Sequence, residues 1–195
     1  MKNDKRTDDL LRGYYYHIYN NCNNSERMFF EERNYAYFLG KFKQHISDFV
    51  NVYAYCLLPD HFHFILYIKE LDIRIDEGKR RIVSQAFSNF FNSYTKSVNI
   101  QERRSGNLFN RPFKRTLINN ENYLKDLICY LHKNPMHHGV KTDYRNYMWS
   151  SYRDILDNKS DFIRSNEVLN LFSGPDNFKE SHITGYDNIV HEFEI

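Results

Sequence analysis

A chain of 195 residues with 41% hydrophobic content suits one compact domain and is too short for two full domains. Its three cysteines lie far apart without a CxxC spacing, which argues against both a disulfide framework and a zinc knuckle. The N-terminal segment lacks the apolar core of a signal peptide, and no stretch approaches the roughly 18 apolar residues of a membrane span. We therefore expect a cytoplasmic protein with no membrane partner.

The formal net charge of +2 is unevenly distributed along the chain. Residues 161–195 contain seven acidic and two basic side chains, whereas residues 1–160 contain 25 basic and 18 acidic ones. This difference predicts one domain over residues 1–160 and an acidic C-terminal appendage over residues 161–195. We expect the appendage to be partly helical and to be broken by the turn residues of 173–176.

The first elements follow from hydrophobic spacing and turn residues. β-forming residues predict a strand at 13–22, and apolar residues three and four apart predict a helix at 34–48, opened by an Asn34 cap. Two β-rich runs at 50–58 and 62–68 are separated by Pro59 and Asp60. These two residues favour a turn, so the runs should form an antiparallel hairpin.

The same signals predict the rest of the chain: a loop at 71–81, a helix at 82–98, a strand at 113–118, a helix from Asn120 or Glu121 to about Lys133 that Pro135 limits, and a short helix after Tyr152. The resulting order of strands and helices resembles a ferredoxin-like split unit. We expect an α+β fold, with a ferredoxin-like or RRM-like antiparallel sheet and helices on one or both faces.

The segment His61-Phe62-His63 is the first candidate for chemistry. Alternate residues of a strand project from the same face, so the two imidazoles could converge on one ion while Phe62 points into the core. An H-x-H pair in a strand is nevertheless more often incidental than a ligand pair. A second signal is needed.

The predicted helix that ends near Pro135 supplies such a signal. Tyr130 and Asn134 are four residues apart and so share one helical face. Asn134 could complete a metal's ligand shell with a neutral oxygen, and Tyr130 could offer a phenol to a phosphate one turn away. Taken alone, the pair could equally be a buried aromatic and a residue before a proline.

A basic stretch surrounds these residues. Nine Lys or Arg and four acidic residues lie between positions 101 and 145, interleaved with aromatic residues such as Phe109 and Phe113. A surface that binds phosphates and stacks bases needs this composition. A solvated charged face would show the same composition.

Four blocks in order and spacing closely resemble the REP-associated tyrosine transposases, which belong to the single-tyrosine HUH superfamily: CLLPDHFHFIL, SGNLFNRPFKRTLI, ENYLKDLICYLHKNPMHHGV and YMWSSYRDIL. The resemblance covers roughly residues 13–156. It implies an HUH endonuclease fold, His61 and His63 as ligands of a divalent metal, Asn134 as the third ligand, and Tyr130 as the nucleophile.

The resemblance also implies a partner, which is single-stranded DNA that contains a hairpin, in a nucleoid-associated cytoplasmic setting. The candidates for gripping this DNA are Arg111, Lys114, Arg115 and Lys133, with Lys125 a less specific one. No small-molecule cofactor is expected, and related enzymes occur as monomers and as homodimers.

The expected chemistry follows from the phosphodiester. An ordinary phenol has a pKa near about 10 and a phosphodiester repels anions. Mg²⁺ or Mn²⁺ could act as Lewis acid and template, with Mn²⁺ the better match to nitrogen ligands. Attack by Tyr130 would leave a free 3′-hydroxyl and a 5′-phosphotyrosine, which a second 3′-hydroxyl could reverse to give strand transfer.

Some positions depart from the family pattern or leave alternatives open. Asp60 stands where the family often has Asn or Glu, and His137 stands near a position where the family usually has a stronger cation. Tyr123 is a second candidate nucleophile, two turns before Tyr130. A non-catalytic, domesticated nucleic-acid binder and a phosphohydrolase that uses activated water remain alternatives.

Overall fold

The computed structural model describes residues 9–23, 27–70, 78–158 and 160–185. Within these ranges the chain forms a four-stranded antiparallel sheet with the strand order β2-β3-β1-β4. The strands are β1 (Tyr15–Asn21), β2 (Val50–Leu57), β3 (His61–Ile68) and β4 (Lys114–Ile118). This arrangement confirms the predicted α+β fold and its ferredoxin-like sheet.

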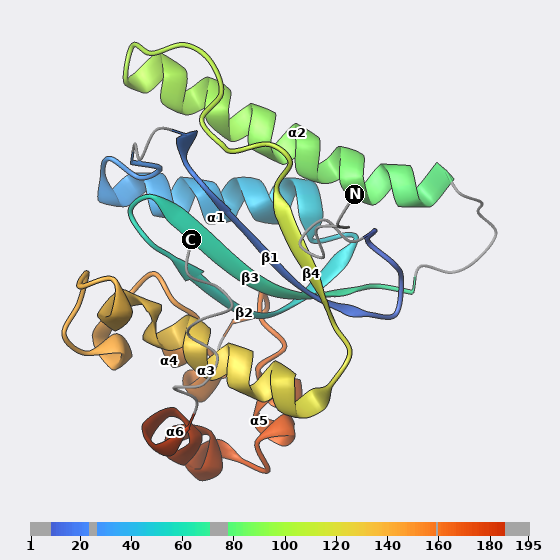
Figure 1. The fold of residues 1–195 in the computed structure, drawn as a ribbon, viewed down its shortest axis with the longest axis vertical. Helices are drawn as coiled ribbons and strands as arrows, with labels where there is room; N and C mark the ends of the chain where they lie inside the picture. The colour runs from blue at the N-terminus through green and yellow to red at the C-terminus, as the bar shows by residue number, and fades with distance from the viewer. Residues whose placement is uncertain (1–8, 24–26, 71–77, 159, 186–195) are drawn as a thin grey trace, which may run out of the picture.

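The helices cover both faces of the sheet (Figure 1). Helices α1 (Glu32–Ile46) and α2 (Gly78–Gln101) lie on one face, and α3 (Glu121–His137) lies on the other. The 3-10 helix η2 (Tyr144–Asn146) follows α3, and three short helices then pack on the α3 side: α4 (Tyr152–Asp157), α5 (Ser165–Leu171) and α6 (Pro175–Thr184). No helix within the described ranges is long and apolar enough to cross a membrane.

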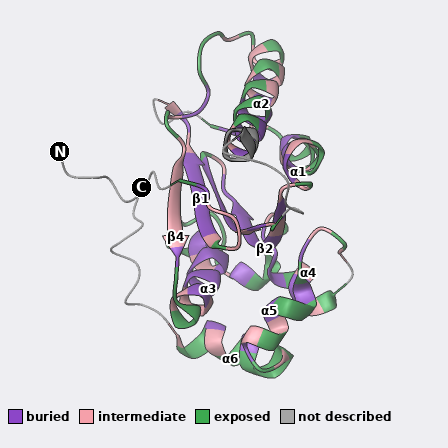
Figure 2. Ribbon diagram, turned by 90° about the vertical axis from the view of Figure 1, so that its right-hand side faces the viewer, coloured by how far each residue is buried: buried purple, intermediate pink, exposed green. Residues whose placement is uncertain are grey.

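Alternation along β3 separates the core from the candidate site. Phe62 and Phe64 point toward α1 and α2, where the Phe64 ring stacks on Phe42 with 4.2 Å between centroids and Phe62 lies 5.3 Å from Phe38. Burying each such ring contributes about 1.5–3 kcal/mol. The sheet is correspondingly buried between its two helical layers (Figure 2). The residues that alternate with these phenylalanines, His61 and His63, must face α3.

The predicted N-terminal cap of the first helix is wrong. The helix begins at Glu32 after the N-cap Glu31, and Asn34 lies inside its first turn. The Asn34 side chain instead reaches back and accepts hydrogen bonds from the backbone N–H groups of Phe30 and Glu31 at 3.0 and 2.9 Å. An Asn three residues into a helix can therefore satisfy the free N–H groups as well as one at the cap position.

Two other helix boundaries differ from prediction. Helix α2 begins at Gly78 and ends at Gln101, which makes it longer than the predicted 82–98, and residues 71–77 of the predicted loop lie outside the described ranges. Helix α3 continues through Pro135 to His137. A proline in the last turn removes only one backbone hydrogen bond, and the Pro135 carbonyl accepts from Val140 at 2.8 Å, so the helix end remains satisfied.

The C-terminal helices pack onto the sheet layer through buried residues. Ile163 bridges Val52 of β2, and Phe178 of α6 is fully buried. The predicted break at residues 173–176 is confirmed, because α5 ends at Leu171 and α6 begins at Pro175. The division at residue 160 stays a prediction.

Candidate active site

His61 and His63 emerge from β3 on the face that α3 covers. The two side chains are 4% and 1% exposed, and their ring centroids are 5.2 Å apart. Phe62 between them points to the opposite face, as predicted. Alternation of a strand thus places two imidazoles side by side in a buried space.

Each of these imidazoles is held by its Nδ1 atom. His61 Nδ1 lies 2.7 Å from Asp60 Oδ1, so it donates to the carboxylate, and this hydrogen bond holds the pKa of Asp60 below its usual value. His63 Nδ1 lies 2.9 Å from His17 Nε2 on the adjacent strand β1. Fixing Nδ1 in this way orients the ring and leaves Nε2 for a ligand.

The Nε2 atoms of His61 and His63 are buried and have no hydrogen-bond partner. Burial, reinforced by neighbouring histidines, lowers the pKa of His63 well below its usual value, so this imidazole is neutral and its ring nitrogen retains a lone pair. A buried polar atom without a partner costs free energy unless something else satisfies it. Two such atoms on adjacent rings are what a cation site requires.

Asn134 adds a third unsatisfied group from α3. Its side chain is fully buried, and neither its Oδ1 nor its Nδ2 has a hydrogen-bond partner. The end of α3 reaches β3 through His138, whose backbone N–H donates to the Asn134 carbonyl at 3.0 Å and whose ring centroid lies 4.6 Å from that of His61. The helix end that contains Asn134 therefore lies beside the first histidine.

Tyr130 precedes Asn134 by one turn of α3 and is 4% exposed. Its ring centroid lies 5.5 Å from that of His137, in the last turn of the same helix. The α3 helix packs against β2 and β4, and Asn120 caps its start by accepting from the N–H groups of Asn122 and Tyr123. Spacing and packing thus put the phenol on the same side of α3 as the carboxamide.

These residues fit a divalent cation. Within the described residues, no group of three or more His, Cys, Asp and Glu side chains is placed to hold a metal, so an ion here would need the Asn134 oxygen beside the two histidines. Imidazole nitrogens with a neutral amide oxygen suit Mn²⁺, and Mg²⁺ to a lesser degree.

Three residues near this site were not predicted to take part in it. Asp60 and His17 form hydrogen bonds with His61 and His63, and the His138 ring makes an edge-to-face contact with the His61 ring. Asp60 departs from the family pattern, and the sequence alone gives it no role in the site. The alternation of His17 with Tyr15 and Tyr19 indicates that the three side chains share one face of a strand. The contact of His17 with His63 depends on the register between β1 and β3, which the sequence does not give.

The predicted DNA-gripping residues do not gather in one place. Arg111 donates to Asn92 of α2 at 3.2 Å, whereas Lys133 of α3 donates to the Gly185 carbonyl at 3.0 Å on the other side of the sheet. Lys114 pairs with Tyr19 and Arg115 with Ile18, so these neighbours of β4 point to opposite faces. Lys125 forms an ion pair with Glu121 at 2.8 Å.

Comparison with known proteins gives two similarities. No family model matches the chain. A Haemophilus influenzae protein provisionally named a REP-associated tyrosine transposase is 26% identical over 134 residues, which is 58% of this chain and 74% of that protein. A solved structure of a REP-associated tyrosine transposase bound to a REP hairpin has a TM-score of 0.56 and 18% identity, and the match covers 80% of this chain and 87% of that one. The chain thus resembles the REP-associated tyrosine transposases in sequence, and its fold is similar to that of the hairpin-bound transposase.

Proposed function

We propose that this protein is a metal-dependent single-stranded DNA transposase that nicks and rejoins DNA near hairpins through a 5′-phosphotyrosine. The observation that carries the proposal is the set of buried, unsatisfied atoms on His61, His63 and Asn134, of which Asn134 is one helical turn from Tyr130. The sequence relative and the fold neighbour both support it, since the latter is a transposase bound to a REP hairpin.

The metal would be held by His61 Nε2, His63 Nε2 and Asn134 Oδ1, and when bound it would supply Lewis-acid neutralisation of a phosphate oxygen. The protein's own residues prepare this site. Asp60 and His17 fix the two imidazole rings through their Nδ1 atoms, so the donor nitrogens do not have to reorganise. Phe62 and the aromatic core behind it anchor β3 to the helical layer of α1 and α2.

Tyr130 would be the nucleophile. Its phenolic oxygen gives up a proton and attacks phosphorus, a new bond forms between phosphorus and this oxygen, and the bond to the 3′-oxygen breaks. The released 3′-oxygen takes up a proton, and the 5′-phosphate stays on the tyrosine. Because the number of phosphoester bonds is unchanged, a 3′-hydroxyl from another strand can reverse the step and join the DNA.

The burial of Tyr130 sets a condition on this chemistry. The side chain is only 4% exposed, so the side chains that cover it must move before DNA can reach the phenol. His137 is one of these side chains, with its ring centroid 5.5 Å away in the last turn of α3. We expect DNA binding to reorganise this turn.

The test is covalent trapping. The wild-type protein, Tyr130→Phe, Tyr123→Phe and His61→Ala are incubated with a labelled hairpin oligonucleotide that has single-stranded flanks, with Mn²⁺ or with EDTA. We expect a protein–DNA adduct on a denaturing gel for the wild type and Tyr123→Phe in Mn²⁺ only. Adduct formation by Tyr130→Phe would refute the nucleophile.

Two other outcomes would replace the proposal. Binding without metal and without any adduct, at every hairpin tested, would favour a non-catalytic nucleic-acid binder. Metal-dependent cleavage that releases both ends without an adduct and persists in Tyr130→Phe would favour a phosphohydrolase that activates water.

A further inference from the structure

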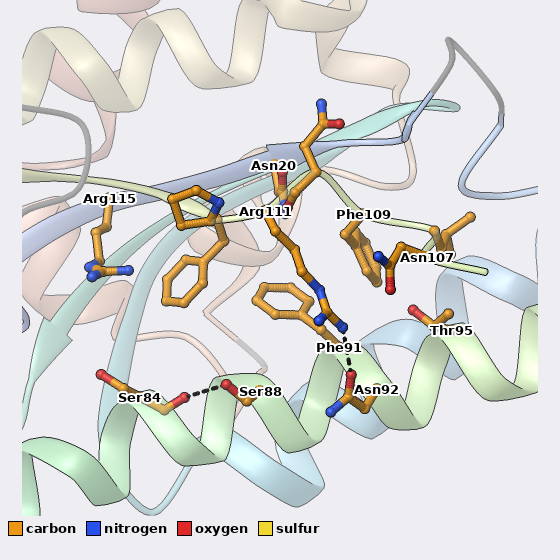
Figure 3. A pocket seen from close by; sticks show the side chains of 14 residues that line it. Asn20, Ser84, Ser88, Phe91, Asn92, Thr95, Asn107, Phe109, Arg111 and Arg115 are labelled. Atoms are coloured by element: carbon orange, nitrogen blue, oxygen red, sulfur yellow. Dashed lines mark hydrogen bonds between the residues drawn. The ribbon is translucent and has the colours of Figure 1, made fainter. Parts of the chain in front are cut away.

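A cavity of about 380 Å³ lies between α2 and the segment that leads into β4, on the face of the sheet away from His61 and His63 (Figure 3). The register fixes this side. Arg115 pairs with Ile18, Ile18 pairs with Phe64, and Phe64 stacks on Phe42 of α1, so all of these side chains point toward α1 and α2. The candidate active site does not use this cavity.

The cavity has an aromatic floor. Phe91 of α2 lies 4.9 Å from Phe109 and 5.3 Å from Phe113 between ring centroids. Phe91 and Phe109 are almost fully buried, whereas Phe113 is half-buried. The ring planes are tilted by 54° and 53° at these two contacts, so the rings together give the hollow an apolar base against which a planar, aromatic ligand can pack.

Neutral polar side chains line the walls above this floor. Each carries an amide or a hydroxyl, so each can both donate and accept hydrogen bonds. Seven of them line the cavity: Asn20, Ser84, Ser88, Asn92, Thr95, Asn107 and Asn110. This mixture suits the edge of a nucleobase, which presents donors and acceptors side by side.

Two guanidinium groups lie at the rim. Arg111 is oriented by its hydrogen bond to Asn92, and the Arg115 guanidinium carbon lies 4.8 Å from the centroid of the Phe113 ring. The adjoining hollow of about 340 Å³ shares Arg111 and adds Lys96 and Arg104. Neither set of lining residues contains an acidic side chain, so this surface favours phosphates.

We infer that this cavity binds one unpaired nucleotide of a single-stranded DNA segment. The base lies on the floor of Phe91, Phe109 and Phe113, and its phosphate lies between Arg111 and Arg115. A base inside a duplex cannot enter such a hollow, because it is stacked and paired. The choice of DNA rests on the proposed function, whereas the aromatic floor and cationic rim by themselves indicate a base joined to a phosphate.

A DNA strand bound in the cavity can continue into the adjoining hollow. A strand that leaves the cavity past Arg111 meets Lys96 of α2 and Arg104, which follows the end of α2, and further phosphates can bind there. The flank of a hairpin held on this face would be separated by the sheet from the site where the strand is cut. The cavity would therefore contribute to choosing the DNA and not to the chemistry.

The test measures binding with the Tyr130→Phe protein in EDTA, so that neither metal nor nicking affects it. Fluorescence anisotropy compares a hairpin with a single-stranded flank, the same hairpin without its flank, and a mononucleotide. Arg111→Gln and Phe113→Leu are compared with Lys141→Gln, which removes one exposed positive charge outside the cavity. Thermal unfolding checks that each variant is folded.

We expect Arg111→Gln and Phe113→Leu each to weaken binding of the flanked hairpin about tenfold, and to leave the unflanked hairpin within about twofold. An abasic nucleotide at one flank position should weaken binding to the same degree, and Phe113→Leu should lose nothing more on that DNA.

Losses equal to those of Lys141→Gln on both hairpins would overturn the inference in favour of general charge attraction. A mononucleotide that binds as tightly as the flanked hairpin would overturn it in favour of a free-nucleotide site. Because these measurements need no nicking, a failure of the proposed function would show only in the trapping experiment.

Discussion

His17 Nε2 on β1 lies 2.9 Å from His63 Nδ1 on β3, in a hydrogen bond between two fully buried side chains. For His63 to offer its Nε2 lone pair, its Nδ1 must bear the proton and donate it to His17. The neighbouring strand thus selects the tautomer of a candidate metal ligand. The Asp60 carboxylate fixes the tautomer of His61 in the same way, because it accepts a hydrogen bond from His61 Nδ1.

The first prediction concerns His17 as a positioning residue. Replacing His17 with leucine removes the acceptor and frees the His63 ring to rotate or change tautomer. We expect Mn²⁺ affinity, measured by titration calorimetry on the metal-free protein, to fall about 10–100-fold. His17→Gln keeps an acceptor oxygen and should recover part of the affinity.

His45→Gln is the matched control, because His45 lies on α1 across the sheet. Its affinity for Mn²⁺ should equal that of the wild type. If His17→Leu remained folded by circular dichroism and bound Mn²⁺ as tightly as the wild type, His17 would be a structural residue only.

The second prediction concerns the carboxamide of Asn134. A fully buried amide whose Oδ1 and Nδ2 have no hydrogen-bond partner costs about 1–3 kcal/mol. Leucine has a similar shape and no polar atoms. In EDTA, Asn134→Leu should therefore have a free energy of unfolding equal to or up to about 3 kcal/mol above that of the wild type, by urea titration.

The same variant should lose the stabilisation that Mn²⁺ gives to the wild type, because one of three proposed ligands is gone. Asn134→Leu that is less stable than the wild type in EDTA would show that the amide is satisfied in the folded protein. The Asn134 oxygen would then not be available as a ligand for a cation.

The order of strands and helices could be predicted because each element has a local signal. Side chains that alternate between the two faces indicated β3, and residues three and four positions apart on one helical face indicated α1 and α3. The boundaries at Asn34 and Pro135 could not be placed, since both depend on which backbone groups the rest of the fold satisfies. Local propensity shows which residue types are common at a helix end, but it does not show which backbone groups they will bind.

The sequence could predict that His61 and His63 share one face of a strand, but it could not predict which residues hold their rings. His61, His63 and Asn134 follow from spacing and family resemblance, whereas the contact of His17 with His63 requires the register of β1 against β3. For the basic residues, proximity in the sequence does not predict proximity in the fold. Arg115 and Lys114 are adjacent in sequence, yet the pleat of β4 sends them to opposite faces.

The third prediction concerns pH and the contact between α3 and α6. His132 Nδ1 lies 2.8 Å from His182 Nε2, and both rings are buried. Burial lowers the pKa of His132 well below its usual value and lowers the pKa of His182 to about 4. The unfolded chain, with histidine pKa values near about 6.5, therefore binds protons first as the pH falls.

The folded protein should accordingly lose stability between about pH 6.5 and pH 4, and His182 alone should account for about 3 kcal/mol of this loss. His182→Gln keeps hydrogen-bonding groups and does not titrate. Its free energy of unfolding in EDTA should depend less steeply on pH than that of the wild type. Parallel curves would exclude a contribution from His182.

The last prediction concerns residues 161–195, whose charge suggested an appendage. Phe178 of α6 is fully buried, with its ring centroid 5.1 Å from Phe172, 5.5 Å from Tyr152 and 4.3 Å from His182. Because these contacts link α6 to α5 and α4, Phe178→Ala should destabilise the whole protein by about 3–5 kcal/mol in one cooperative unfolding transition. Ile183→Ala on the same helix is the control, since Ile183 is 71% exposed and its loss should change stability by less than about 0.5 kcal/mol. A separate early transition in Phe178→Ala, with the main transition unchanged, would instead identify α6 as an independent appendage.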